Sequence, residues 1–184
     1  MSPLATVLDL LAMRAPTLGD GRLVCIDGPA GAGKSTLAEA VAGAHRDVEV
    51  RLLHMDDLYP GWSGLAHVDE QLDAVLTPLA QGRPGRYRRY DWAAGEYAET
   101  VAVAPAPLVV LEGVGSGSSR FRDLQTVLVW VEAPYDTRMR RGIERDGEAF
   151  APYWDQWATD EQELFARERT RDRADVVVDG TRPY

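Results

Sequence analysis

"IDGPAGAGKSTLAEAVA", residues 26–42, is the stretch that decides the fold, because its residues 28–35 match the phosphate-loop pattern G-x-x-x-x-G-K-[ST] in full. It contains Lys34, the only lysine of a chain in which the other 19 of 20 basic residues are arginine. Glycines let the backbone curl so that successive N–H groups face one phosphate, and a following helix presents its positive N-terminal end to the same anion. The stretch therefore predicts a binding site for a nucleoside triphosphate.

The pattern also predicts a role for individual positions. Lys34 is expected to reach the β- and γ-phosphates, and the Ser35 hydroxyl is expected to ligate Mg²⁺. We expect ATP as co-substrate and Mg²⁺ as cofactor, with the choice between ATP and GTP left open. The predicted nucleotide-binding residues are Gly28, Ala30, Gly31, Ala32, Gly33, Lys34, Ser35 and Thr36.

Outward from this loop, short apolar runs alternate with segments of helical periodicity. The runs predict strands at 22–27, 48–57, 107–115, 126–133 and 174–180, and the periodic segments predict helices at 3–14, 34–45, 69–82, 136–147 and 155–171. Residues 83–105 are irregular and are expected to form a loop or a short hairpin. This alternation predicts an α/β three-layer sandwich with a mainly parallel five-stranded sheet, as one domain over 1–184.

The composition limits the classes of partner. A formal net charge of −9 argues against nucleic acid and anionic membranes, whose binding needs a basic face, so we expect a small-molecule partner. The single cysteine, Cys25, lies in an apolar run and is expected in the core. The first residues lack the basic segment of a signal peptide, which predicts a cytoplasmic location. The oligomeric state is left open, a homo-oligomer included.

Acidic and basic residues outside the loop suggest phosphoryl-transfer chemistry. Asp56 and Asp57 end the predicted strand 48–57, and an open α/β sheet places its ligands at strand ends. A carboxylate there could accept the proton of an attacking hydroxyl, or merely cap a loop. Arg138, Arg141 and Arg145 share one face of the helix predicted within a lid region at about 134–150. These arginines could close over phosphates or form a solvated face.

Aromatic side chains and a second arginine cluster lie on the irregular segments. The aromatic residues could stack on a base or sugar, or could anchor loops: Tyr59, Trp62, Tyr90 and Trp92. The basic cluster could hold an acceptor phosphate, or could lie on a solvated loop: Arg83, Arg86, Arg88 and Arg89. His54, two residues before Asp56, could orient it from the same strand face or be an ordinary buried histidine. Trp154 and Trp157 are expected to pack onto the fold.

The segments "GPAGAGKST", "MDDLY", "VVLEGV", "RMRRGIERD" and "ADVVVDG" resemble the uridine kinase and phosphoribulokinase group of phosphate-loop kinases, over most of residues 22–180. The resemblance implies that Asp56 is the base that activates the acceptor hydroxyl and that Tyr59 lies against the acceptor. It implies that Glu112 is a second carboxylate near Mg²⁺, which it contacts partly through water. It places Arg141, Arg145 and Asp146 in the lid. It also implies the P-loop NTPase fold of the nucleoside/nucleotide kinase type.

The same resemblance matches "YDW", residues 90–92, to the acceptor segment of the family, so Tyr90 and Trp92 join Asp56, Tyr59 and Glu112 as predicted substrate-binding residues within about 56–100. Lys34, Asp56, Arg141 and Arg145 are the predicted catalytic residues. The hypothesis is a kinase that transfers the γ-phosphoryl group to a hydroxyl, most simply of a nucleoside.

Other acceptors stay open at this stage. The histidine that usually follows this segment in uridine kinases is missing, and the chain reads "AAGEY" there. A nucleoside monophosphate kinase would need no base, because its acceptor is already ionised. A sugar or another hydroxyl-bearing metabolite would fit the same scaffold. A regulatory module would bind ATP with negligible transfer.

Overall fold

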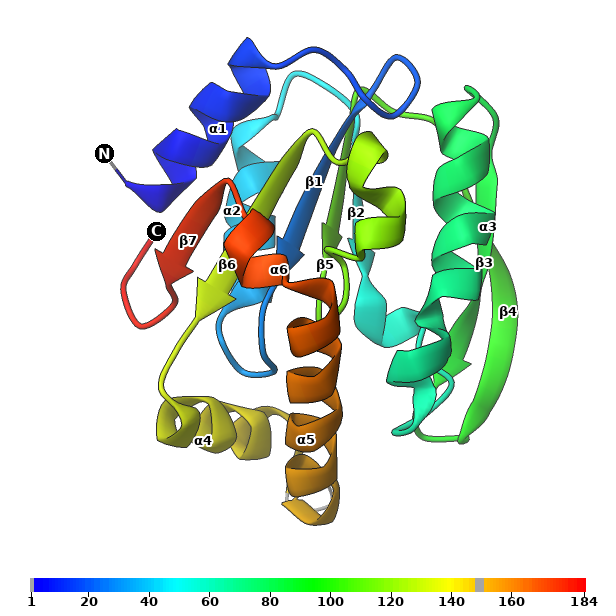
Figure 1. Ribbon diagram of the computed structural model, residues 1–184. Helices are drawn as coiled ribbons and strands as arrows, with labels where there is room; N and C mark the ends of the chain where they lie inside the picture. Colours follow the sequence, from blue (N-terminus) through cyan, green and yellow to red (C-terminus); the bar gives the residue numbers. More distant parts are fainter. Residues whose placement is uncertain (1, 148–150) are drawn as a thin grey trace.

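Five parallel strands form the central sheet of the computed structural model, which describes residues 2–147 and 151–184 (Figure 1). Their order across the sheet is β2-β5-β1-β6-β7. The central strand β1 pairs with β5 on one side and β6 on the other, so the loop that follows β1 leaves from the middle of the sheet. The strands are β1 Arg22–Asp27, β2 Val50–His54, β5 Leu108–Glu112, β6 Val127–Glu132 and β7 Val176–Asp179.

Two layers of helices cover the sheet. On one face, Val24 and Ile26 of β1 pack in a core with α1 (Pro3–Met13) and α2 (Lys34–Ala44). On the other face, Leu23 and Cys25 pack in a core with α3 (Val68–Ala80) and α5 (Ala151–Glu168). Because alternate side chains of a strand point to opposite faces, a continuous apolar run supplies both cores. The predicted three-layer α/β sandwich with a five-stranded parallel sheet is confirmed.

The second predicted strand is shorter than expected. β2 ends at His54, and Met55–Asp57 form a single 3₁₀ turn, η1, which the Leu58 N–H closes onto the Met55 carbonyl at 2.9 Å. Asp56 therefore lies in a turn beyond the sheet. The expectation that His54 and Asp56 share one strand face is wrong.

The irregular segment 83–105 forms an antiparallel hairpin of β3 (Gly85–Asp91) and β4 (Glu96–Val103), separate from the main sheet. Gln71 of α3 bonds both backbone groups of Arg88, accepting from its N–H at 3.2 Å and donating to its carbonyl at 3.1 Å. The hairpin is thus fixed to α3 beside the carboxyl ends of the strands. The short turns η2 (Gly64–His67) and η3 (Ser119–Leu124) both lie beside α3.

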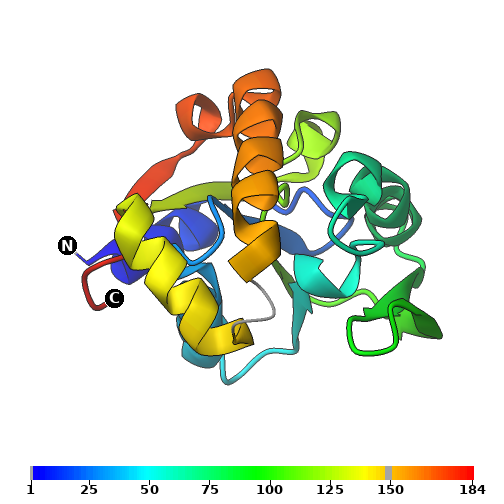
Figure 2. The ribbon, with the colours of Figure 1, turned by 90° about the horizontal axis from the view of Figure 1, so that it is seen from below.

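The predicted lid region contains α4 (Tyr135–Asp146), which ends at Gly147, while residues 148–150 lie outside the described part. Seen along the strands from their carboxyl ends, α4 and the start of α5 lie over this edge of the sheet (Figure 2). The short helix α6 (Thr170–Arg173) then leads into β7. No helix among residues 2–147 and 151–184 has the length and apolar character needed to cross a membrane.

Candidate active site

The phosphate loop joins β1 to α2 at the carboxyl edge of the sheet. Gly28 and Gly31 have positive φ angles, 138° and 75°. A Cβ atom would lie 2.0 Å from the Val131 carbonyl oxygen at Gly28 and 2.4 Å from the Arg138 carbonyl oxygen at Gly31. Both conformation and space therefore require glycine at these two positions.

Lys34, at the start of α2, is buried, and its Nζ donates to the Pro29 carbonyl at 2.9 Å. Burial lowers the pKa of this ammonium, and the negative charges of nearby carboxylates oppose that effect. These carboxylates belong to Glu112, Glu161, Asp27 and Asp56. Lys34 is thus held inside the loop, where the charges of these carboxylates favour its ammonium form.

Beside the loop, a chain of hydrogen bonds fixes the carboxylate of Glu112. The Ser35 hydroxyl donates to Glu112 Oε1 at 3.1 Å, and His54 Nδ1 donates to the same oxygen at 2.7 Å. Burial alone would raise the pKa of Glu112, but the bond from His54 and the charge of Lys34 hold it below its ordinary value. The same bond to Glu112 raises the pKa of His54. His54 thus orients Glu112, not Asp56.

Hard oxygen atoms of this kind suit Mg²⁺. The ion typically keeps several waters and takes one or two protein ligands together with substrate phosphates. The Ser35 hydroxyl and the ionised Glu112 carboxylate, adjacent at 3.1 Å, match that donor set. Within the described residues, no group of three or more His, Cys, Asp or Glu side chains could hold a metal ion by itself. Ser35 and Glu112 would hold Mg²⁺ together with the phosphates of a bound nucleotide.

Asp27, the last residue of β1, fixes the start of the phosphate loop through hydrogen bonds of its carboxylate. Its fully buried carboxylate accepts three backbone hydrogen bonds, from Gly28 at 2.7 Å and from Gly115 and Gly117 at 2.9 Å each. Burial raises its pKa to about 6, although these bonds favour the charged form. The carboxylate ties the phosphate loop to the segment that follows β5.

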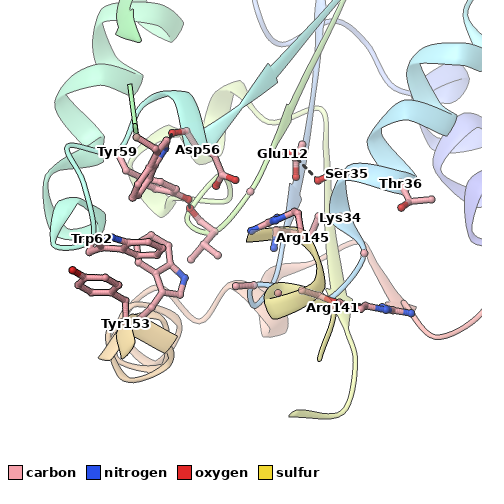
Figure 3. A pocket seen from close by; sticks show the side chains of 18 of the residues that line it. Lys34, Ser35, Thr36, Asp56, Tyr59, Trp62, Glu112, Arg141, Arg145 and Tyr153 are labelled. Atoms are coloured by element: carbon pink, nitrogen blue, oxygen red, sulfur yellow. Dashed lines mark hydrogen bonds between the residues drawn. The ribbon is translucent and has the colours of Figure 1, made fainter. Parts of the chain in front are cut away.

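A cavity of about 720 Å³ opens over the loop (Figure 3). One end, the phosphate end, is formed by the loop, the start of α2, and Arg141 and Arg145 of α4. The other end, the aromatic end, is formed by Tyr59, Trp62, Trp92, Tyr153 and Trp157. Asp56 lies between these ends, facing the same space as Glu112 and Arg145 (Figure 3).

The aromatic end is a packed cluster drawn from three parts of the chain. Trp62 stacks on Tyr153 with ring centroids 4.8 Å apart and planes 3° apart. Trp92, from the hairpin, meets Trp62 edge to face at 4.8 Å, and Trp157 of α5 meets Tyr59 edge to face at 5.1 Å. Such contacts stabilise the cluster beyond simple burial. The Trp92 indole N–H also donates to the Asp56 carbonyl at 2.9 Å, which ties the turn η1 to this end.

Most of the residues predicted from the sequence meet at this cavity. Its lining includes Ala30, Gly31, Gly33, Lys34, Ser35, Thr36, Asp56, Tyr59, Trp92, Glu112, Arg141 and Arg145. Gly28 and Ala32 belong to the loop but do not line the cavity. Tyr90 does not line it either, because its ring packs behind Trp92 at 5.3 Å and against Tyr97 at 5.6 Å. Tyr59 is fully buried, with its ring against Trp157 and its hydroxyl donating to the Val114 carbonyl.

The predicted arginine face of α4 is divided by the structure. Arg141 Nη1 donates to the Gly180 carbonyl at 3.0 Å and lies 3.4 Å from the Gly31 carbonyl. Arg138, for which the sequence left open a place over phosphates or on a solvated face, is instead buried in an ion pair with Glu161 at 3.0 Å. Arg138 thus supports the loop from behind, and Arg141 and Arg145 face the cavity.

The hairpin arginines lie outside the cavity. Arg89 makes a two-point ion pair with Glu99, at 2.8 and 3.0 Å, and Arg88 covers the ring of Tyr97 at 4.4 Å. Arg83 and Arg86 are exposed.

Sequence reasoning missed Tyr153, Glu161 and Asp27, because their roles depend on contacts between residues distant in the chain. Trp157 was expected only to pack, and it packs and lines the cavity.

Three solved structures are similar to the chain over nearly its full length. One is described as a possible uridine kinase from Bacillus stearothermophilus (TM-score 0.66, 21% identity, 96% of this chain and 97% of that one). A second is a candidate fructose transport system kinase from a Silicibacter species (TM-score 0.57, 20% identity, 97% of this chain and 99% of that one). A third is a D-glycerate 3-kinase from Cryptococcus neoformans (TM-score 0.52, 15% identity, 90% of this chain and 84% of that one).

At these identities the likeness shows the fold, which is the P-loop kinase fold, as the sequence predicts. No protein-family model matches the chain, and no curated protein sequence matches it.

Proposed function

We propose that this protein is a kinase that transfers the γ-phosphoryl group of ATP to a hydroxyl of a small molecule bound at the aromatic end of the cavity. One observation carries the proposal: a single cavity joins a complete phosphate loop, with Lys34 and Ser35, to the carboxylate of Asp56. The three similar structures are described as a possible uridine kinase, a candidate fructose transport system kinase and a D-glycerate 3-kinase, and these descriptions support the same reaction type.

In the proposed mechanism, the N–H groups of the loop and the ammonium of Lys34 bind the β- and γ-phosphates. Ser35 and Glu112 would hold Mg²⁺, which, when bound, neutralises negative charge on the phosphates. Asp56 accepts the proton of the acceptor hydroxyl. The oxygen of that hydroxyl forms the new bond to the γ-phosphorus, while the bond between the γ-phosphorus and the ADP oxygen breaks. Arg141 and Arg145 offset the charge of the transferred group.

The aromatic end supports a nucleoside as the acceptor. Flat apolar rings stack on a base, whereas a sugar acid or a phosphorylated acceptor needs a cation. The cations that line the described cavity, Lys34, Arg141 and Arg145, all belong to its phosphate end. The hairpin arginines, which would suit a monophosphate acceptor, lie elsewhere and in part are already paired. A neutral acceptor with a flat ring is therefore proposed.

The test is an acceptor screen that follows ADP release from Mg²⁺-ATP. It should include nucleosides, nucleoside monophosphates, a ketohexose and glycerate, because the descriptions of two similar structures name fructose and glycerate. The proposal expects the fastest ADP release with a nucleoside. Tight ATP binding without stimulation by any acceptor would instead indicate a regulatory module.

The variant Asp56→Asn tests the base within the same screen. Loss of a general base slows turnover by roughly 10²- to 10⁴-fold, while ATP binding should be unchanged. If Asp56→Asn turned over at near the wild-type rate, Asp56 would not be the base.

A further inference from the structure

Ala30, in the middle of the phosphate loop, has both backbone groups bound by one buried ion pair. Its N–H donates to Glu161 Oε2 at 2.9 Å, and its carbonyl accepts from Arg138 Nη1 at 3.1 Å. The same Arg138 nitrogen donates to Glu161 Oε1 at 3.0 Å. We call Arg138 and Glu161 the loop clasp.

The clasp is built as an interior feature. The side chain of Arg138 is 9% exposed and that of Glu161 is 2% exposed. Arg138 Nε also donates to the Ala133 carbonyl at 3.2 Å, which fixes the guanidinium before the start of α4. A buried ion pair is weak as a source of stability, because desolvation of the charges offsets their attraction. Its polar atoms instead bind the two peptide groups on either side of the Ala30 Cα atom.

The backbone of Ala30 is held by side chains from outside the loop. The loop contains three glycines with positive φ angles, Gly28, Gly31 and Gly33, and glycine gives the chain the most conformational freedom to lose on binding. Within it, one backbone hydrogen bond joins the Ala32 N–H to the Pro29 carbonyl at 3.2 Å. A binding loop that is ordered beforehand pays less conformational entropy when its ligand arrives.

We propose that Arg138 and Glu161 are positioning residues, which fix the backbone of Ala30 so that the phosphate loop is ordered before a triphosphate binds. The inference rests on the proposed function, since it assumes that the loop binds nucleotide. Because Arg138 belongs to α4 and Glu161 to α5, the clasp also links the loop to the helices that carry Arg141 and Arg145 on one side and Tyr153 and Trp157 on the other.

The experiment compares ATP and ADP affinity by titration calorimetry, on the full chain, at a temperature at which melting curves show every variant folded. Two variants are used. Glu161→Gln keeps the shape and one oxygen for the Ala30 N–H. The double variant Arg138→Met with Glu161→Leu replaces the pair by apolar side chains of similar size, which buried ion pairs often tolerate without loss of stability.

The double variant should bind ATP and ADP about tenfold more weakly. The backbone of Ala30 is then released, and the entropic cost of ordering it on binding lowers the affinity for nucleotide. Glu161→Gln should lie between it and the wild type. Glu99→Gln, which breaks the hairpin ion pair of Arg89, is the charge-matched control and should bind nucleotide as the wild type does.

Wild-type or tighter ATP binding by the double variant would overturn the proposal. It would show that the clasp only joins helices, or that Glu161 competes with phosphate for the Ala30 N–H. If the double variant does not fold, Glu161→Gln decides by the same affinities, and unchanged binding overturns the proposal. Because binding is measured without an acceptor, failure to find a phosphoryl acceptor would count against the proposed function and leave this test intact.

Discussion

Lys34 shows at the scale of a single residue how selective this site is for one kind of cation. The chain otherwise uses arginine for every basic residue, and this one ammonium is 7% exposed and close to the Pro29 carbonyl. A guanidinium is planar and wider, with five donors in a fixed fork, whereas an ammonium is a compact point charge. The enclosed position behind the loop suits the ammonium.

We therefore expect Lys34→Arg to weaken ATP binding by about tenfold or more and to slow turnover by about 100-fold, although the net charge is unchanged. Titration with ATP and measurement of ADP release would check this. The converse replacement Arg182→Lys, at an exposed arginine, should leave both quantities unchanged. Full activity of Lys34→Arg would mean that charge alone matters at this position.

At the scale of elements, the aromatic end depends on how one turn, one hairpin and one helix are brought together. Trp62 follows η1, Trp92 follows β3, and Tyr153 lies in the first turn of α5. Their rings contact one another at 4.8 Å, so each element positions the others' side chains. The proposed acceptor site is thus formed by side chains from three elements of the chain rather than from one segment.

Trp62→Ala should raise the KM for the acceptor about tenfold and leave the KM for ATP unchanged, because the lost stacking lies only at the aromatic end. Steady-state kinetics with each substrate varied in turn would measure both constants. Tyr97→Ala removes an aromatic ring of the hairpin outside the cavity and serves as the control. An equal rise in both KM values would contradict a separate acceptor end.

The elements differ in how well the sequence predicted them. Periodicity and apolar runs are local signals, so the strands and helices, and the loop at 28–35, were predicted within a few residues. The η1 turn was missed because Asp56 and Asp57 follow an apolar run without a glycine or proline between them. The buried position of Arg138 was not predicted, because its partner Glu161 is 23 residues away and the arginines of α4 were interpreted as one charged face.

The same limit applies to the site. Lys34 and Ser35 were predicted because a motif fixes their surroundings. The bond between His54 and Glu112 joins residues 58 apart that meet only because β2 and β5 are neighbours in the sheet. Strand order is set by the whole fold, so no local pattern contains it.

At the scale of the whole molecule, the stability should carry a pH dependence from Asp27. Its pKa in the folded protein, about 6, lies above the ordinary 3.8, so the folded state binds this proton more tightly than the unfolded state does. The Asp27 contribution to the free energy of unfolding is therefore greatest below pH 3.8 and falls as the pH rises to about 6. The loss would approach about 3 kcal/mol.

Urea denaturation between pH 4 and 8, without nucleotide, would measure this effect as a difference between the wild type and Asp27→Asn. The amide does not titrate, so the stability advantage of the wild type should shrink as the pH rises and become constant above about pH 7. A difference independent of pH would show that the three backbone hydrogen bonds keep Asp27 ionised throughout.

The sole lysine also gives the molecule a chemical label of its own. Amine-selective acylating reagents react with unprotonated side-chain amines and spare guanidinium groups, and burial shifts Lys34 toward the unprotonated form. Acylation of a side-chain amine can therefore occur at one place only, which is the amine enclosed by the phosphate loop. Peptide mass spectrometry of the acylated chain would read occupancy of the loop directly, since a bound triphosphate shields the amine.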